Sequence, residues 1–373
     1  MAASVRVRPS EVALLRLVAQ RLAGPPAAGP ADAVRHLLAL QGQDLRGALV
    51  AVALRCGLAG AGALDAVRAA LADASVVRSW PMRGTLHLVA AEDLGWLLGL
   101  TAERTLAGAA SRRAALGLDE AAFARGREVL VGALAGGRSL TRAEALDALR
   151  DAGLLDGPGQ RGYHLLWHLA HTGLVCWGPP AAPPDGAARG QGDEQRLVLL
   201  DEWVPQPRRL PREEALGELA RRYLAGHGPA TVADLVRWSG LRVGDVRTSL
   251  ALARPSLEVL DVDGVEHLLD PATPALLDGA RTAARRPRLL PGFDEMVLGY
   301  ADRTATLAAE HEPLVVPGGN GIFAPTVVVG GRAVGTWRRT GRVRGPALEV
   351  TPFTTLPAAV ERALPRLSAA LPA

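Results

Sequence analysis

The sequence repeats one order of patterns, in which helical stretches are followed by short strand-like arms. Apolar residues recur at helical spacing in several stretches between residues 10 and 73, and the period becomes strand-like over 76–89. The same order returns in 120–177 and in 212–269. Helices followed by a small hairpin describe a winged helix, so the pattern predicts three tandem winged-helix units.

Local signals mark boundaries inside these repeats. Thr141 and Glu144 have the spacing of a capping box, and Thr231 and Asp234 repeat that spacing. The third pair of arms turns at Asp263-Gly264, a dipeptide typical of a tight hairpin. These signals predict helix starts at two places and a hairpin at the third.

The end of the chain has a β pattern. A hairpin with a Gly-Gly turn is predicted over 326–337, a further strand over 348–353 and a final helix over 357–371. The predicted class is therefore α+β, with three tandem winged-helix units and a C-terminal antiparallel β-barrel. The predicted domains are residues 1–115, 116–208 and 209–286 for the winged helices, and 287–373 for the barrel and last helix.

Two glutamines flank a glycine at Gln41-Gly42-Gln43, between two apolar segments. Residues two apart point to nearly opposite sides of a helix, whereas on a strand they share a face. We expect a helix over 31–40 to end near Gln41, with Gly42 adopting the unusual backbone angles that bring both amides to one site. The alternative is an ordinary helix C-terminus whose amides satisfy nearby carbonyls.

The chain of 373 residues contains no lysine, because all 42 of its basic residues are arginine. A P-loop, a pyridoxal Schiff base and a lysine-based lyase step are therefore excluded. The formal charge of +4 is compatible with a polyanionic partner. Cys56 and Cys176 are too few for a disulfide framework, and no apolar run is long enough to span a bilayer. We expect a cytoplasmic protein without a cofactor.

Four stretches of the sequence, the glutamine segment among them, together resemble a known family. They read LQGQ at 40–43, RSWPMRGTLH at 78–87, LLPGFDEMVLGYADR at 289–303 and GTWRR at 335–339. Together, and in this order, they resemble the AlkZ/YcaQ-like family of winged-helix DNA glycosylases, which excise bulky alkylated bases. The resemblance covers residues 10–353. Gln-x-Gln alone is weak evidence, whereas the four stretches in one chain are specific.

The resemblance implies a function and a catalytic pair. The family's signature is Gln-x-Gln in its azinomycin-resistance branch and Gln-x-Asp in its YcaQ branch, so Gln41 and Gln43 match the former. That branch is associated with removal of N7-alkylguanine adducts, including interstrand crosslinks left by genotoxic natural products. The implied protein is a monofunctional DNA glycosylase, acting in DNA repair or in self-resistance of a producer organism. Its implied fold, three winged helices and a β-barrel around duplex DNA, agrees with the pattern.

A pair of amides suits this substrate class. Glutamine does not titrate in this range, but it can hold one water molecule in line through a hydrogen bond. Guanine alkylated at N7 is already cationic and leaves as a neutral base, so it needs no acid. We expect Gln43 to hold the water and Gln41 to support it or to contact the sugar. Asp44 can supply a negative charge at the sugar, pair with Arg46, or cap a helix.

Candidate DNA contacts lie on the first hairpin. Arg83, Thr85 and His87 occupy alternate positions of one arm, so a strand would point them to one face. Together with Arg78 of the same stretch they form a wedge or phosphate clamp. The alternative is a solvated hairpin face.

A second basic group lies in the β end. Arg338 and Arg339, with Arg342 and Arg344 close behind, form its densest basic patch and suit phosphate contacts. The alternative is an exposed basic edge that discourages strand pairing.

Two further groups of polar residues stand out. His164, His168 and His171 share one helix face, but no carboxylate or cysteine accompanies them at ligand spacing, so we predict no metal site. Asp294, Asp302 and Arg303 belong to the stretch that resembles the family, and we expect buried salt bridges that hold the barrel on the third winged helix.

The main alternative function is a non-enzymatic winged-helix regulator that binds DNA by sequence. Such proteins usually carry one winged helix per chain and dimerise, whereas three units in one chain suit a monomer that wraps a lesion. The expected partner is therefore double-stranded DNA containing alkylated guanine, with no membrane involved.

Overall fold

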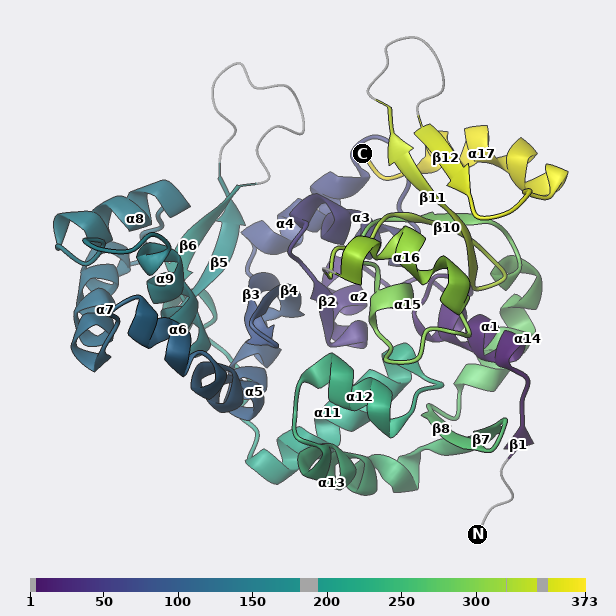
Figure 1. Cartoon of the computed structure of the whole chain (residues 1–373), viewed down its shortest axis with the longest axis horizontal. Helices are drawn as coiled ribbons and strands as arrows, with labels where there is room; N and C mark the ends of the chain where they lie inside the picture. The colour runs from purple at the N-terminus through teal and green to yellow at the C-terminus, as the bar shows by residue number, and fades with distance from the viewer. Residues whose placement is uncertain (1–4, 182–193, 320, 341–347) are drawn as a thin grey trace. The chain divides into compact units, whose positions relative to one another are not determined.

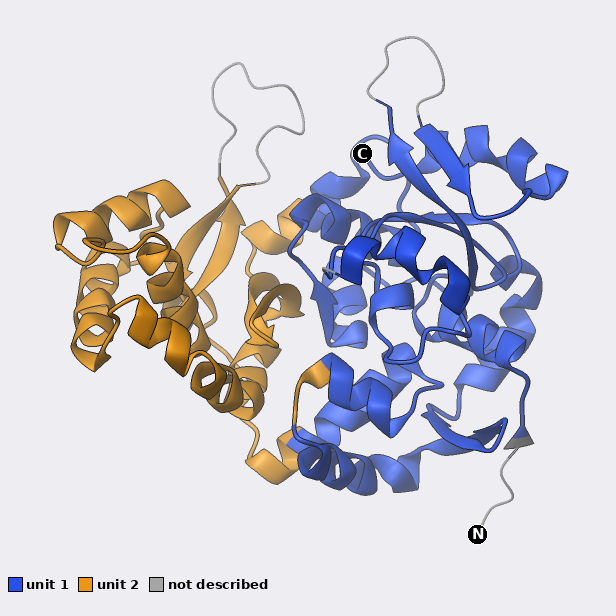
Figure 2. Ribbon diagram, in the orientation of Figure 1, with its two compact units in different colours: residues 1–67, 216–238, 242–373 blue, residues 68–215, 239–241 orange. Residues whose placement is uncertain are grey.

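The computed structural model describes residues 5–181, 194–319, 321–340 and 348–373 (Figure 1). The chain combines helices with mainly antiparallel sheets. It forms two compact units: unit 1 contains residues 1–67, 216–238 and 242–373, and unit 2 contains residues 68–215 and 239–241 (Figure 2). The division into four successive domains stays a prediction.

The predicted order of helices followed by a hairpin is present three times. The first set is α1 (Pro9–Ala19), α2 (Pro30–Leu37), α3 (Leu45–Arg55), α4 (Ala63–Ala72), β3 (Val76–Met82) and β4 (Thr85–Ala90). The second set is α7 (Glu120–Leu134), α8 (Arg142–Asp151), α9 (Arg161–His171), β5 (Val175–Pro180) and β6 (Gln195–Leu199). The third set is α11 (Arg212–His227), α12 (Val232–Ser239), α13 (Val243–Ala253), β7 (Glu258–Val262) and β8 (Val265–Leu269). Their assignment as winged helices stays a prediction.

The predicted caps and the predicted turn are confirmed. Thr141 and Glu144 form a capping box at the start of α8, and the Asp234 N–H donates to the Thr231 hydroxyl at the start of α12. Asp263 and Gly264, at φ 51° and 81°, close the β7–β8 hairpin. A short strand missed from the sequence, β1 (Val5–Arg6), pairs parallel to β7.

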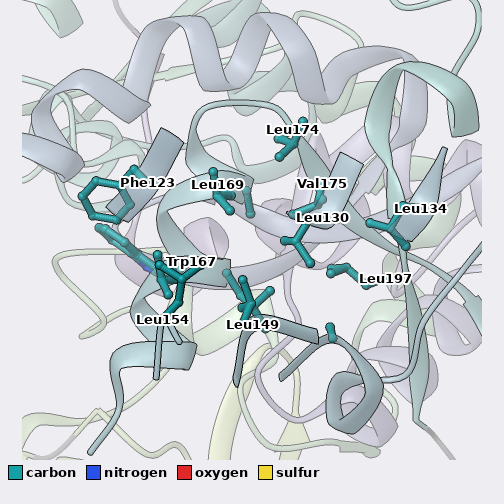
Figure 3. Packing of buried hydrophobic residues seen from close by; sticks show 14 of the residues in the cluster. Phe123, Leu130, Leu134, Leu149, Leu154, Trp167, Leu169, Leu174, Val175 and Leu197 are labelled. Carbon is teal, nitrogen blue, oxygen red and sulfur yellow. The ribbon is translucent and has the colours of Figure 1, made fainter. Parts of the chain in front are cut away.

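Unit 2 is built around one apolar core. Its sheet has the strand order β4-β3-β5-β6, and α7, α8 and α9 contribute leucines to the cluster beside it. Figure 3 shows this packing, with Phe123 of α7, Leu149 of α8 and Trp167 of α9 turned toward the same core as Val175 and Leu197 of the strands. Two helices of this unit, α5 (Leu94–Gly108) and α6 (Ala110–Ala115), were not predicted.

The C-terminal strands form an open sheet in the described residues. Its order is β12 (Leu348–Pro352), β11 (Arg332–Arg339), β10 (Thr326–Val329) and β9 (Arg288–Leu290), with β12 and β9 at the edges. The predicted β-barrel is therefore not found. Four strands are too few to close around a core, and the faces of the sheet are covered by other elements instead. Helix α17 (Ala358–Ala370) buries Val360 in the same cluster as Trp337.

A run of buried polar contacts joins the N-terminal helices of unit 1 to its C-terminal half. Arg55, the last residue of α3, donates two hydrogen bonds of 2.9 and 3.0 Å to the carboxylate of Asp294. A further Arg55 N–H donates to Gln20 Oε1 at 2.6 Å, and Gln20 donates to the Tyr300 hydroxyl. The Arg55–Asp294 pair is almost completely buried.

The expected salt bridges of Asp294, Asp302 and Arg303 are only partly found. Asp294 is buried and paired, but its partner belongs to α3 and not to the third set of helices. Arg303 pairs with Glu312, and Asp302 accepts from Thr304 within its own turn. Asp234 makes the link to the third set, because its carboxylate accepts from the N–H groups of Ala301 and Asp302.

No helix among the described residues combines the length and the apolar character that crossing a bilayer requires.

Replacing Asp294 with alanine should strongly destabilise the protein, because the Arg55 guanidinium would stay buried without its counter-ion. We expect the free energy of unfolding to fall by about 3–5 kcal/mol, measured by urea denaturation followed by tryptophan fluorescence. The matched control is Arg254→Ala, which breaks the exposed pair with Glu266 and should cost less than about 1 kcal/mol. Equal losses for the two variants would contradict the assigned importance of the buried pair.

Candidate active site

The segment that carries the two glutamines begins with an unusual turn. Helix α2 ends at Leu37, Leu38 has φ 67° and ψ −47°, and β2 (Ala39–Gln41) follows. The predicted helix over 31–40 is therefore too long, and the positive φ falls on Leu38 and not on Gly42. These angles are close to those of a strained γ-turn, which a leucine adopts only where the surroundings hold it. Leu38 is completely buried, so packing overrides its local preference.

The two glutamines have different environments. Gln41 is 8% exposed; its backbone N–H donates to Glu295 Oε1 at 3.0 Å, and its own Oε1 accepts from the Gly42 N–H at 3.2 Å. Gln43 is exposed to solvent. The backbone of Gln41 is thus held by a distant carboxylate, whereas the side chain of Gln43 lies at the surface.

Asp44 is the N-cap of α3. Its Oδ1 accepts from the Gly47 N–H at 3.1 Å, which is one of the three roles expected for it. A Cβ atom at Gly47 would lie 2.5 Å from Asp44 Oδ2 and 3.3 Å from the carbonyl oxygen of Gly292. A side chain at position 47 would therefore displace the capping carboxylate and press on the backbone of the 289–303 stretch, which meets the cap at the start of α3.

Glu295 is a buried carboxylate that the sequence did not single out. It is 1% exposed and belongs to α15 (Glu295–Leu298). Besides the Gln41 N–H, it accepts from Trp238 Nε1 at 3.0 Å, and its Oε2 lies 3.3 Å from His227 Nε2. The available signal was its place in the LLPGFDEMVLGYADR stretch, directly after Asp294.

The basic end of β11 lies close to the start of α3. Burial lowers the pKa of Arg339, and the nearby charge of Arg46 lowers this pKa further. Arg339 also donates to the carbonyl oxygen of Pro372 at 3.2 Å. Arg338 instead pairs with Glu349 at 2.7 Å on the exposed face of the sheet. Arg342 and Arg344 lie outside the described residues.

The polar residues of the β3–β4 hairpin do not all lie on one strand face, although the alternating pattern predicted that they would. Arg83 and Gly84, at φ 54° and 69°, form the turn, so Arg83 is not a strand residue. Its guanidinium lies 3.1 Å from His87 Nε2, and His87 Nδ1 lies 2.8 Å from the Thr85 carbonyl oxygen. Because a guanidinium can only donate, His87 is neutral with its proton on Nδ1.

His87 therefore has a supporting position. It is completely buried, whereas Arg83 and Thr85 are partly exposed. Arg78, also partly exposed, donates to Gln195 Oε1 at 3.3 Å. The four candidate DNA contacts of the hairpin belong to unit 2, and the glutamine pair belongs to unit 1.

The three histidines of α9 do not converge. His168 stacks on Phe123 with ring centroids 3.6 Å apart, and His171 is buried with its Nδ1 2.8 Å from the Trp167 carbonyl oxygen. Burial lowers the pKa of His171 to about 4. Across the described ranges, no three His, Cys, Asp or Glu side chains gather closely enough to hold a metal ion.

Known proteins resemble this chain over most of its length. The sequence pattern of the family described as DNA glycosylase AlkZ-like matches residues 34–372. A curated relative, the interstrand DNA cross-link repair glycosylase of Streptomyces sahachiroi, is 29% identical over 346 residues, which cover 86% of this chain and 84% of the relative. The solved structure of the Streptomyces sahachiroi DNA glycosylase AlkZ matches with a TM-score of 0.78 and 28% identity, covering 99% of this chain and 98% of that one.

The family match includes the Gln41-Gly42-Gln43 segment, the hairpin of Arg83 and the stretch that holds Glu295. It spans residues 34–372, and the match to the solved structure covers 99% of the chain. The chain belongs to the AlkZ-like family of DNA glycosylases.

Proposed function

We propose that this protein is a monofunctional DNA glycosylase that releases bulky N7-alkylguanine from duplex DNA, crosslinked guanines included. The observation that carries the proposal is the contrast between Gln41, which is buried and fixed by Glu295, and Gln43, which is exposed beside it. Family membership supports the reaction class. The name of the Streptomyces sahachiroi relative supports crosslinks among the substrates. We also propose a role in DNA repair or in self-resistance to a DNA-alkylating product.

The reaction needs only what two amides can provide. The bond between C1′ and N9 breaks, and its electron pair neutralises the positive charge of the alkylated base. A water molecule held by Gln43 adds to C1′ and gives its proton to solvent, while Gln41 supports it. Because an undamaged guanine would leave as an anion, the same site should not release it. Selectivity for cationic bases then follows from the missing acid.

The surroundings of the segment favour a phosphate backbone. The positive charge of Arg46 is near enough to lower the pKa of Arg339, so the two guanidinium groups can contact one phosphate backbone together. We infer that these groups bind the strand that carries the lesion and that the protein acts as a monomer. Arg83, oriented by His87, is the candidate contact of unit 2.

The double variant Gln41→Ala/Gln43→Ala should release N7-alkylguanine about 10²- to 10⁴-fold more slowly, because the water loses its positioning groups. Free base released from alkylated duplex DNA under single-turnover conditions is measured by mass spectrometry. The exposed Gln206 provides a matched control, and Gln206→Ala should keep the wild-type rate. Undiminished release by the double variant would refute the assignment. Binding to a unique operator without any base release would favour a regulator.

The abasic product should persist as an intact strand. A side-chain Schiff base requires a lysine amine, and the sequence contains none. Borohydride added during the reaction should therefore trap no side-chain complex with DNA, and strand breaks should form only after alkali or heat. A lysine-dependent bifunctional glycosylase serves as positive control. Breaks that appear without alkali or heat would contradict a monofunctional reaction.

Replacing Arg339 with alanine should weaken binding to undamaged and alkylated duplexes alike, because a phosphate contact carries no sequence information. The slope of the logarithm of the binding constant against the logarithm of the salt concentration should fall by about 1. Fluorescence anisotropy over a salt series measures both quantities. Arg254→Ala, which removes an exposed arginine paired with Glu266, should leave the slope unchanged. Equal slopes for Arg339→Ala and the wild type would exclude this contact.

A further inference from the structure

The proposed reaction creates a cationic sugar, and neither glutamine carries a charge to stabilise it. We propose that Glu295 is the positioning residue that holds Gln41. Its buried carboxylate also supplies the negative charge that stabilises the cationic sugar. This inference rests on the proposed glycosylase function. It assigns a carboxylate to a site whose sequence motif contains only amides.

The contacts of Glu295 connect it directly to the segment. Its Oε1 accepts from the Gln41 backbone N–H at 3.0 Å, across a sequence separation of 254 residues. Its Oε2 accepts from Trp238 Nε1 at 3.0 Å and lies 3.3 Å from His227 Nε2. Nitrogen donors favour the ionised form of a carboxylate. The carboxylate can therefore act as a charged acceptor that fixes the position of Gln41.

Backbone strain is present on both sides of this contact. Leu38, three residues before Gln41, has φ 67°, and Phe293, two residues before Glu295, has φ 59°. Bulky residues rarely adopt positive φ, and such conformations gather at sites where the fold imposes a geometry. Two strained residues beside one hydrogen bond indicate that the bond sets the geometry of the segment.

Burial decides which nearby carboxylate can act over a distance. Asp44 is closer in sequence but exposed, so water and salt screen its charge. Asp294 is buried as well, but its carboxylate accepts from Arg55 and from the Met296 N–H, whereas Glu295 accepts from Gln41 of the segment itself. Glu295 is 1% exposed, and a charge in such surroundings acts through a low effective dielectric. We expect it to favour the cationic sugar by about 10- to 100-fold.

The test compares two abasic-site analogues in otherwise identical duplexes. One carries a pyrrolidine ring, which is cationic and resembles the charged sugar, and the other carries neutral tetrahydrofuran. The wild type should bind the pyrrolidine duplex more tightly, and Glu295→Gln should reduce this preference about 10- to 100-fold while binding to the neutral duplex changes little. A purely structural role would weaken both duplexes equally and would overturn the proposal.

Three further variants make the comparison decisive. Asp294→Asn removes a neighbouring buried charge and should weaken both duplexes alike while lowering the melting temperature. Trp238→Phe removes one of the donors that favour the ionised form of Glu295, so the preference for the pyrrolidine duplex should fall while binding to the neutral duplex changes little. It carries the test if Glu295→Gln does not fold, and an unchanged preference then counts against the proposal. A selective loss in Asp44→Asn, with none in Glu295→Gln, would move the role to Asp44 and overturn it as well.

The two proposals fail in different ways. If the wild type releases no base from alkylated duplex DNA, the glycosylase function fails, whatever the analogues show. If the wild type releases base and prefers the pyrrolidine duplex, but Glu295→Gln keeps that preference, only the role of Glu295 fails.

Discussion

The buried ion pair between Arg55 and Asp294 is the interaction on which the glutamine segment depends. It joins the end of α3 to the residue that precedes Glu295, and both partners are almost completely removed from water. The two hydrogen bonds of the pair fix the loop before α15, and the next residue along the chain holds Gln41. Because a buried charge without its partner is costly, the pair makes this placement hard to distort.

Sequence reasoning located the features that depend on local chemistry. The capping box of Thr141, the turn at Asp263 and the hairpin arms follow from residue types a few positions apart. The glutamine pair stood out through its resemblance to a family, while its helix was drawn too long because Leu38 has no local reason to leave the helical region. The contact between Gln41 and Glu295 could not be predicted, since no periodic pattern links residues so far apart. The open C-terminal sheet likewise depends on residues distant in sequence, since it packs against α17 in one cluster and against α1 and α14 in another.

The two glutamines illustrate how one short motif can contain a fixed and an accessible amide. The backbone N–H and the side-chain oxygen of Gln41 both form hydrogen bonds within the protein. Gln43, two residues later, keeps an exposed side chain. In the proposed reaction neither amide titrates, so activity should depend on the charge of the leaving base more than on the pH of the medium. That property suits a lesion that carries its own positive charge.

The turn at Leu38 also limits how the motif can be transferred or altered. It resets the register after α2, so a single-residue insertion or deletion between Leu38 and Gln41 would move both glutamines by one position, and neither amide would keep its present environment. Grafting the tripeptide alone onto another helix end would transfer its sequence without the backbone conformation that positions the two amides. A functional transplant would need the turn at Leu38, the strand β2 and the start of α3 with Gly47. It would also need an acidic side chain from a distant part of the recipient chain that accepts from the Gln41 N–H.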